Sequence, residues 1–184
     1  MNQKEHLTSE GLHNFISIKA SINRGLSDTL IDSFPNIQVI DRPVIETTEI
    51  PDPNWIAGFS TAESCFDVNI IKKITAKLGY QTQLRFRISQ HVRDRALLGL
   101  IVSYLNCGTL QSYRDTVEFY VSGYKDIINI IIPFFNKYPI HGAKAFDYAD
   151  FCKIALLIED KAHLTKEGLD KIRKMKAAMN TGTK

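Results

Sequence analysis

The sequence has few cysteines and no long hydrophobic run, and both absences narrow the class of protein. Its three cysteines, Cys65, Cys107 and Cys152, are widely spaced and indicate neither a disulfide framework nor a zinc knuckle. The richest apolar run, Ile127 to Phe135, is interrupted by an asparagine and a proline and is too short to cross a bilayer. No secretory signal precedes the first expected helix, and the five histidines show no ligand spacing. We therefore expect an intracellular globular protein without a membrane partner.

Positive charge is unevenly distributed along the 184 residues. The chain is 44% hydrophobic and 23% charged, as expected of a soluble globule, and its formal net charge is only +3. Between Asp67 and Arg95, however, seven lysines or arginines face two acids, a local net charge of +5. A basic segment inside a nearly neutral chain favours a polyanionic partner such as nucleic acid.

Hydrophobic periodicity predicts an α+β fold with the order α-β-β-α-β-β-α-α-α. Apolar residues alternate with polar ones in four segments, which is typical of half-buried strands: 66–71, 80–90, 109–113 and 117–122. Helical spacing is found over 93–105, 125–137, 143–159 and 165–179, and in residues 1–25 at the start of the chain. We expect a four-stranded antiparallel sheet with helices on one face and the other face free.

The two ends of the chain repeat each other. Residues 4–25 align without a gap on residues 161–182 at a constant offset of 157, and 11 of these 22 positions are identical. Fixed repetition of HLT, EG and a final Asn-x-Gly favours duplication over shared helical composition. The prediction is that residues 1–25 are the closing helix of a preceding repeat, 26–51 a proline-containing linker and 52–184 one domain. The alternative is a self-contained protein with two similar helices.

The segment from Trp55 to Phe66, WIAGFSTAESCF, is the most informative part of the chain. Asp52 can cap a helix here, and Pro53 suits its first turn. One face of this helix carries almost no side-chain bulk and is predicted to be an interface with another helix, through Ala57, Gly58, Thr61 and Ala62. Glu63 lies at the negative end of the helix dipole, where an anion is unfavourable without a cation. This position favours metal binding.

The nine residues from Ile56 to Ser64 resemble the LAGLIDADG motif of homing endonucleases, and the likeness extends to the flanking pattern. Ser64 stands where that family usually has its last glycine. Monomeric members encoded in fungal mitochondrial introns have two halves, related by a pseudo-two-fold axis, whose motif helices pack together. The resemblance implies that this chain is the second half of such an enzyme, with a mitochondrial location. Its partner would be an N-terminal half or a second copy, bound through the motif helix.

The resemblance also implies a chemistry, the metal-dependent hydrolysis of phosphodiesters in double-stranded DNA. Glu63 matches the acid that holds the metal, Mg²⁺ or Mn²⁺, with Ca²⁺ as a non-productive substitute. Gln90 matches a glutamine near the attacking water, and Lys125 lies near the basic residue of the active site. A second acid is expected from the partner motif helix.

A set of DNA-binding residues follows from the alternation in the second strand. Arginine can bind guanine O6 and N7, and glutamine can bind adenine N6 and N7, whereas lysines of a turn suit phosphates. The predicted DNA-binding residues are Asn69, Lys72, Lys73, Lys77, Gln81, Gln83, Arg85, Arg87, Ser89, His91, Arg93, Gln111 and Tyr113.

Two other functions are compatible with these residues. The first is an intron maturase, in which the fold binds RNA as a splicing cofactor without cleaving DNA. The second is a DNA-binding fragment whose active site is incomplete. Glu63, Gln90 and the alternating basic strand favour cleavage.

Overall fold

The computed structural model describes residues 7–22, 25–41 and 48–181. The chain divides into two compact units, residues 1–46 and 47–184, each of which is described here by itself. The boundary lies within the segment predicted as a linker. The ends of the first predicted helix (residues 1–6 and 23–24) and residues 42–47 of that linker lie outside the described residues.

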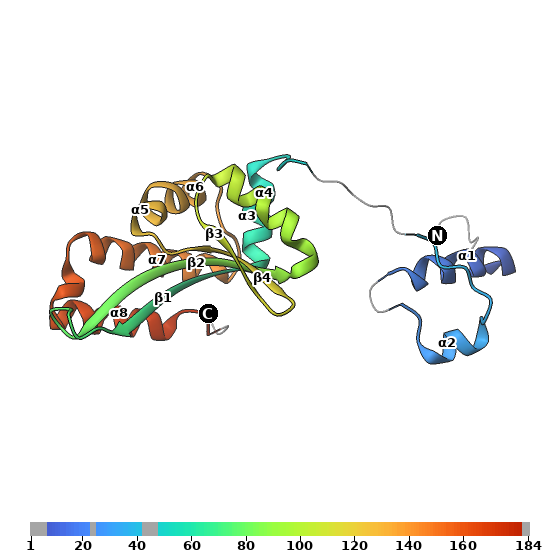
Figure 1. Cartoon of the computed structure of the whole chain (residues 1–184), viewed down its shortest axis with the longest axis horizontal. Coiled ribbons are helices and arrows are strands. Elements are labelled where there is room, and N and C mark those ends of the chain that lie inside the picture. The colour runs from blue at the N-terminus through green and yellow to red at the C-terminus, as the bar shows by residue number, and fades with distance from the viewer. Residues whose placement is uncertain (1–6, 23–24, 42–47, 182–184) are drawn as a thin grey trace. The chain divides into compact units, whose positions relative to one another are not determined.

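The second unit contains the predicted four-stranded sheet (Figure 1). Its strands are β1 (Ser64–Lys72), β2 (Tyr80–His91), β3 (Thr109–Tyr113) and β4 (Thr116–Val121). They are antiparallel and lie in the order β1-β2-β4-β3. The prediction of an α+β fold with an antiparallel sheet is confirmed.

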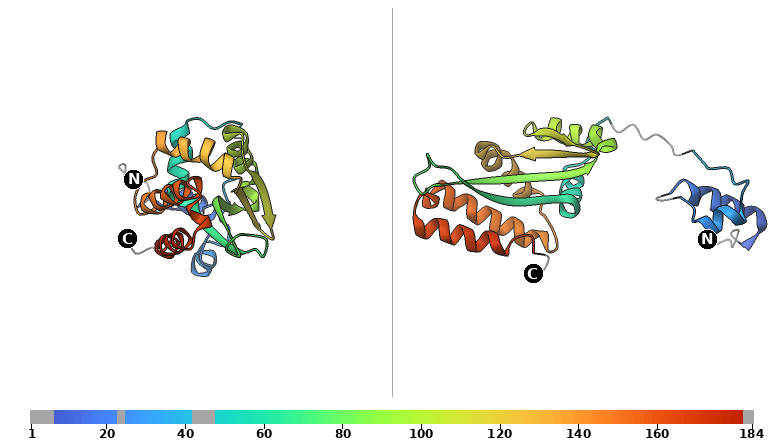
Figure 2. Two further views of the ribbon diagram at one scale, coloured as in Figure 1. Left: turned by 90° about the vertical axis from the view of Figure 1, so that its left-hand side faces the viewer. Right: turned by 60° about the horizontal axis from the view of Figure 1, so that its bottom comes forward.

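Helices cover one face of this sheet, and α7 and α8 run side by side beneath β1 and β2 (Figure 2). The bounds are α3 (Pro53–Glu63), α4 (Arg95–Leu105), α5 (Tyr124–Asp126), α6 (Ile132–Lys137), α7 (Lys144–Glu159) and α8 (Lys166–Ala178). The core between the layers is built on five phenylalanines that are at most 1% exposed, Phe66, Phe86, Phe119, Phe135 and Phe151. Their burial stabilises each side chain by roughly 1.5–3 kcal/mol. No described helix has the length and apolar character needed to cross a membrane.

The helix predicted over 125–137 is not uniform. Residues Ile127–Ile131 form a π-helical turn between α5 and α6. Pro133, in the first turn of α6, has no N–H to donate to the preceding turn. A π turn next to a proline is a usual way to accommodate the missing hydrogen bond.

The first unit contains α1 (Ser9–Ala20) and a short helix, α2 (Asp28–Ser33). Helix α2 lies within the segment predicted as a linker, for which no helix is predicted. With six residues, α2 is too short to show a clear apolar period. The ring of Phe34, at its C-terminal end, meets the ring of His13 edge to face at 5.4 Å, and Ile16 of α1 is 3% exposed.

Helices α1 and α8 show the sequence repeat in their structure. Thr8 and Thr165 cap them in the same way, since each side chain accepts a hydrogen bond from a glycine N–H three residues later, at 3.0 and 3.1 Å. Their apolar stripes differ in burial. In α8 the stripe is Leu169, Ile172, Met175 and Met179, all buried in the core or packed against it. In α1 the matching residues are 40–49% exposed: Leu12, Phe15, Ile18 and Ile22.

Gly168 and Gly99 provide a test of this packing. A Cβ at Gly168 would lie 2.0 Å from the carbonyl oxygen of Ala162, so Gly168→Ala should lower the free energy of unfolding by about 3 kcal/mol. A Cβ at Gly99 in α4 would meet nothing within 4 Å, and Gly99→Ala should raise stability by up to about 1 kcal/mol. Thermal melting of both variants measures the difference. Equal melting temperatures would show that α8 does not pack this closely.

Candidate active site and nucleic-acid interface

Glu63 and Gln90 meet where α3 runs directly into β1. Glu63 is the last residue of α3, and Ser64 is the first of β1. Gln90 is the last but one residue of β2, and its Nε2 donates a hydrogen bond of 3.1 Å to Glu63 Oε2. The two predicted catalytic residues, 27 positions apart, therefore form one cluster. Glu63 is exposed, so its other carboxylate oxygen is accessible to a ligand.

The start of α3 follows the sequence prediction. The Asp52 side chain accepts a 2.6 Å hydrogen bond from the Asn54 N–H, and Pro53 occupies the first turn. Ile56 is fully buried, while the rings of Trp55 and Phe59 stack at 5.0 Å and pack against the core. These contacts fix the helix that carries Glu63.

The small-residue face of α3 is narrower than the sequence predicted. Ala57 is 4% exposed and lies inside the unit. Thr61 faces the same way, because its hydroxyl donates to the Ala57 carbonyl at 2.8 Å and accepts from the His141 N–H at 3.3 Å. Gly58 and Ala62 are exposed, and a Cβ at Gly58 would meet nothing within 4 Å. Of the four predicted interface residues, only Gly58 and Ala62 are exposed on the surface of this unit.

A lysine lies at the C-terminal end of α3. The sequence-based prediction that Glu63 needs a metal at this end of the helix dipole did not include this cation. Lys144 at the start of α7 donates from Nζ to the carbonyl oxygen of Ser64. A cation here compensates the negative end of the helix dipole, so the dipole alone does not require a metal at Glu63. Ser64 is 3% exposed and extended, with its hydroxyl 2.6 Å from the Ser60 carbonyl. This conformation does not need the usual glycine.

Lys125 is not brought into the cluster by any described contact. It is exposed in the first turn of α5, and within the described ranges no hydrogen bond or ion pair joins it to Glu63 or Gln90. Its predicted role stays a prediction.

Polar side chains occupy the sheet face opposite the helices. Every second residue is buried over 64–68 of β1, 84–88 of β2 and 117–121 of β4, and the pleat turns the alternate positions of these strands to the free face. From the predicted DNA-binding set, this alternation places there Asn69, Gln81, Gln83, Arg85, Arg87 and Ser89, and the strand register sets Asn69 opposite Gln83. Gln111 and Tyr113 are exposed on β3. On the sheet, the predicted set therefore lies on β1, β2 and β3, while β4, which runs between β2 and β3, carries none of it.

The middle of this face is electrically balanced, contrary to the expectation of concentrated positive charge. Arg85 is paired with Asp67, and Arg87 Nη1 lies 3.4 Å from Glu118 Oε1. Ser89 donates to the same Glu118 oxygen at 2.9 Å. Burial lowers the pKa of Arg87. Its contact with Cys65 and the charges of Glu118 and Asp67 together raise the pKa by more than burial lowers it, so the net shift is upward. The sequence count missed Glu118 because that residue lies 31 positions from Arg87.

The more exposed positive charge lies instead at the two ends of the sheet. Lys72, Lys73 and Lys77 are exposed at the β1–β2 turn, where Lys73 donates to Gln81 at 3.0 Å. At the opposite end, Arg93 is 75% exposed with a loose 3.6 Å pairing to Asp94. The His91 ring accepts a 3.2 Å hydrogen bond from the Arg93 N–H. Basic ends and a balanced centre suit phosphate contacts outside and base contacts inside.

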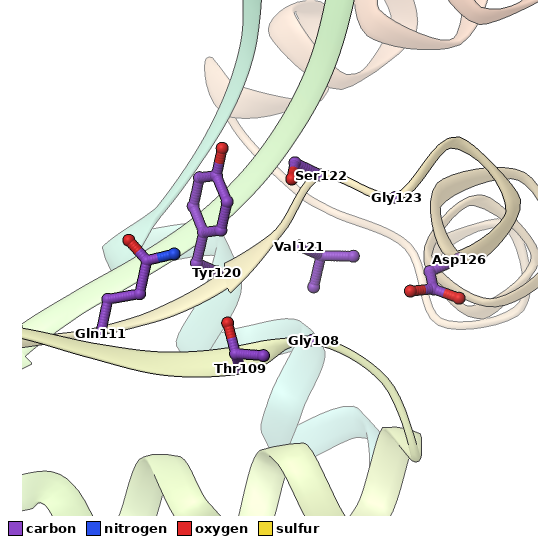
Figure 3. A pocket seen from close by; sticks show the side chains of 8 residues that line it. All are labelled: Gly108, Thr109, Gln111, Tyr120, Val121, Ser122, Gly123 and Asp126. Atoms are coloured by element: carbon purple, nitrogen blue, oxygen red, sulfur yellow. The ribbon is translucent and has the colours of Figure 1, made fainter.

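A pocket of about 310 Å³ opens where β3 and β4 meet the start of α5 (Figure 3). Gln111, Thr109 and Tyr120 line it from the strands, and Asp126 lines it from the helix. Tyr120, like Glu118, lies between buried residues of β4 and belongs to the free face. The predicted DNA-binding set contains neither residue, although the alternation of Val117, Phe119 and Val121 is a signal that could have found them.

The described residues hold no complete metal site of their own. No group of three histidine, cysteine, aspartate or glutamate side chains comes together within residues 7–22, 25–41 and 48–181. Glu63 could supply one carboxylate to a hard cation, which would need further oxygen ligands from substrate, water or another chain.

Known proteins similar to this chain are encoded in fungal introns. "Probable intron-encoded endonuclease 3" of Neurospora crassa is 46% identical over 175 residues, which are 94% of this chain and 33% of that protein. An uncharacterised 50.9 kDa protein in ND4 intron 1 of Podospora anserina is 36% identical over 62% of this chain and 26% of that protein. This chain therefore spans a third or less of the length of these two relatives.

The fold also matches solved structures. I-SmaMI, a LAGLIDADG homing endonuclease bound to cleaved DNA, has a TM-score of 0.95 and 44% identity over 100% of this chain and 62% of that chain. A structure of I-SmaMI with an uncleaved DNA target and calcium ions gives a TM-score of 0.93, again with 44% identity, over 98% of this chain and 62% of that chain. The model of the LAGLIDADG endonuclease family matches residues 56–155, more than half of the sequence. The chain belongs to the LAGLIDADG endonuclease family.

Proposed function

We propose that this chain is one half of a site-specific endonuclease that hydrolyses phosphodiesters in double-stranded DNA. The observation that carries the proposal is the contact between Glu63 and Gln90 at the end of the motif helix. This cluster adjoins a polar sheet face with basic ends, which is a suitable surface for a duplex. The similarity to I-SmaMI, whose structures contain cleaved and uncleaved DNA, supports the same reading.

The chemistry proposed for the cluster is hydrolysis assisted by Mg²⁺ or Mn²⁺. A bound divalent cation would supply Lewis-acid stabilisation of phosphate oxygens and a nucleophilic water. Glu63 offers it one exposed carboxylate oxygen, while Gln90 holds the other at 3.1 Å and fixes the side chain's orientation. The Gln90 amide oxygen can accept a hydrogen bond from a water molecule. Calcium, which is present in one I-SmaMI structure, would act as a non-productive substitute.

A second motif helix would complete the site. Glu63 is a single acid, so the partner's helix must add another, and Gly58 and Ala62 provide the close approach. The partner is an N-terminal LAGLIDADG half or a second copy of this chain. We further propose that residues 1–25 are the closing helix of the preceding half, 26–51 the linker and 52–184 the half-domain. The exposed stripe of α1, equivalent to the buried stripe of α8, supports this division.

The mitochondrion is the proposed location. The Podospora anserina relative is encoded in an ND4 intron, and the Neurospora crassa relative is named as intron-encoded. Both names support an origin in fungal organellar introns.

Substitution of Glu63 tests the proposed chemistry. Glu63→Gln keeps the side-chain shape and removes the charge, so it should abolish Mg²⁺-dependent cleavage by an assembly that linearises plasmid DNA. Binding to duplex DNA, measured by gel shift, should persist or strengthen slightly because repulsion from phosphate is removed.

Glu159→Gln is the matched control, because Glu159 is also an exposed glutamate at the last position of a helix, α7. It should cleave at the parental rate. Cleavage by Glu63→Gln at that rate would remove Glu63 as the metal ligand. Stronger binding to intron RNA than to duplex DNA would instead favour the splicing-cofactor function.

Substitution of Gly58 tests the proposed interface. The open space around Gly58 means that Gly58→Leu should leave the half-domain folded but block close helix contact. We expect an unchanged melting temperature and loss of the assembled species in sedimentation analysis. Gly99→Leu, at another helical glycine with an open surrounding, should assemble normally. An unchanged assembly of Gly58→Leu would place the interface elsewhere.

A further inference from the structure

Arg85 is held by a carboxylate on the neighbouring strand. Asp67 and Arg85 are direct cross-strand partners in the β1–β2 register. Arg85 Nε lies 2.9 Å from Asp67 Oδ2, and Nη2 donates to the same oxygen. The two side chains are only 24% and 17% exposed. An ion pair this covered is screened less than one at an open surface.

The hydrogen bonds of this pair use one particular edge of the guanidinium. Asp67 engages Nε and Nη2, which form the side edge. Nη1 and the second Nη2 hydrogen form the end edge, and no described residue accepts a hydrogen bond from Nη1. Two parallel N–H donors of an arginine match guanine O6 and N7 in the major groove. Arg85 is thus fixed with a complete guanine-binding edge unused.

Arg87, the next arginine on the free face of β2, is held differently from Arg85. Its Nη1 and Nη2 are directed to Glu118 and to the Cys65 sulfur at 3.4 and 3.7 Å, while its buried Nε has no partner. Both terminal nitrogens of Arg87 are thus already engaged, whereas Nη1 of Arg85 has no partner among the described residues. The two arginines therefore differ in what they can offer a base.

We propose that Asp67 is a specificity-determining positioning residue, which holds Arg85 for end-on recognition of one guanine and keeps it from phosphates. This inference rests on the proposed binding of double-stranded DNA. A free arginine side chain reaches phosphate oxygens of any sequence, whereas a held one binds well only where a guanine meets it. By holding Arg85, Asp67 therefore lowers the affinity for DNA of any sequence and raises the preference for one guanine.

The test is selection from a pool of random duplexes by the full chain and by Asp67→Asn. The parent should select a guanine at one position that Arg85→Gln no longer selects. Asp67→Asn should reduce that preference about tenfold. It should also bind unselected DNA more tightly and steepen the slope of log affinity against log salt by roughly 1, as one more phosphate contact becomes available.

Two further variants distinguish the effect of releasing Arg85 from the effect of removing a negative charge. Asp170→Asn removes an equal charge from a 2.9 Å pair with Arg173 on α8 and should leave the selected sequences and the salt slope unchanged. Asp67→Glu keeps the charge but moves the carboxylate by one methylene, so it should lower the guanine preference without steepening the salt slope.

The double variant Asp67→Asn/Arg85→Gln decides whether Asp67 acts through Arg85. No additional loss of selection should appear beyond Arg85→Gln alone. An additional loss would mean that Asp67 contacts a base directly, and the positioning role would be wrong. If Asp67→Asn and Asp67→Glu both select the same sequences as the parent chain, the inference is overturned, whereas the proposed DNA binding is not. A parent chain that binds no duplex even when assembled with its partner half or a second copy would overturn the proposed function together with it.

Discussion

The direct junction between α3 and β1 is the constraint on which the candidate site depends. Glu63 ends the helix, and Ser64 begins the strand, so no connecting residue can absorb a change in the angle between them. Phe66, two residues later, is fully buried and in contact with the rings of Phe86, Phe135 and Phe151. The same short segment thus fixes the acid, the sheet edge and the centre of the core. Only Ser64 and Cys65 separate the carboxylate of Glu63 from the core ring of Phe66.

The free face of the sheet is polar but nearly neutral in charge at its centre. Asp67 and Glu118 balance Arg85 and Arg87 at the centre, so the arginines can be partly covered without the cost of burying unpaired charge. The lysines at the β1–β2 turn remain exposed. In the proposed complex with DNA, the ends of the sheet would supply most of the salt-dependent attraction and its centre the discrimination between sequences.

Features encoded by local periodicity were predictable from the sequence, whereas features that depend on strand register were not. Alternation in β2 correctly assigned Leu84, Phe86 and Ile88 to the core. The pairing of Asp67 with Arg85 depends on where the β1–β2 turn closes, and the contact of Glu118 with Arg87 crosses from β4. Lys144, which donates to the Ser64 carbonyl, lies 80 positions away in the sequence, and no local pattern predicts this contact. Similarly, the inward orientation of Ala57 follows from how α3 packs rather than from its residue spacing.

The repeat between α1 and α8 illustrates the same limit. The two helices share their threonine caps and the spacing of their apolar residues, and sequence comparison alone detects this. Only the structure shows that Leu169 and Ile172 are 3% and 0% exposed while Leu12 and Phe15 are 40% and 49% exposed. A helix that has kept a core-type stripe without burying it retains an unfavourable apolar surface. Such a stripe would be stabilised if another element covered it, as α7 packs against α8 in the second unit. The stripe of α1 has the spacing and the apolar residues of a surface that packs against other helices or strands.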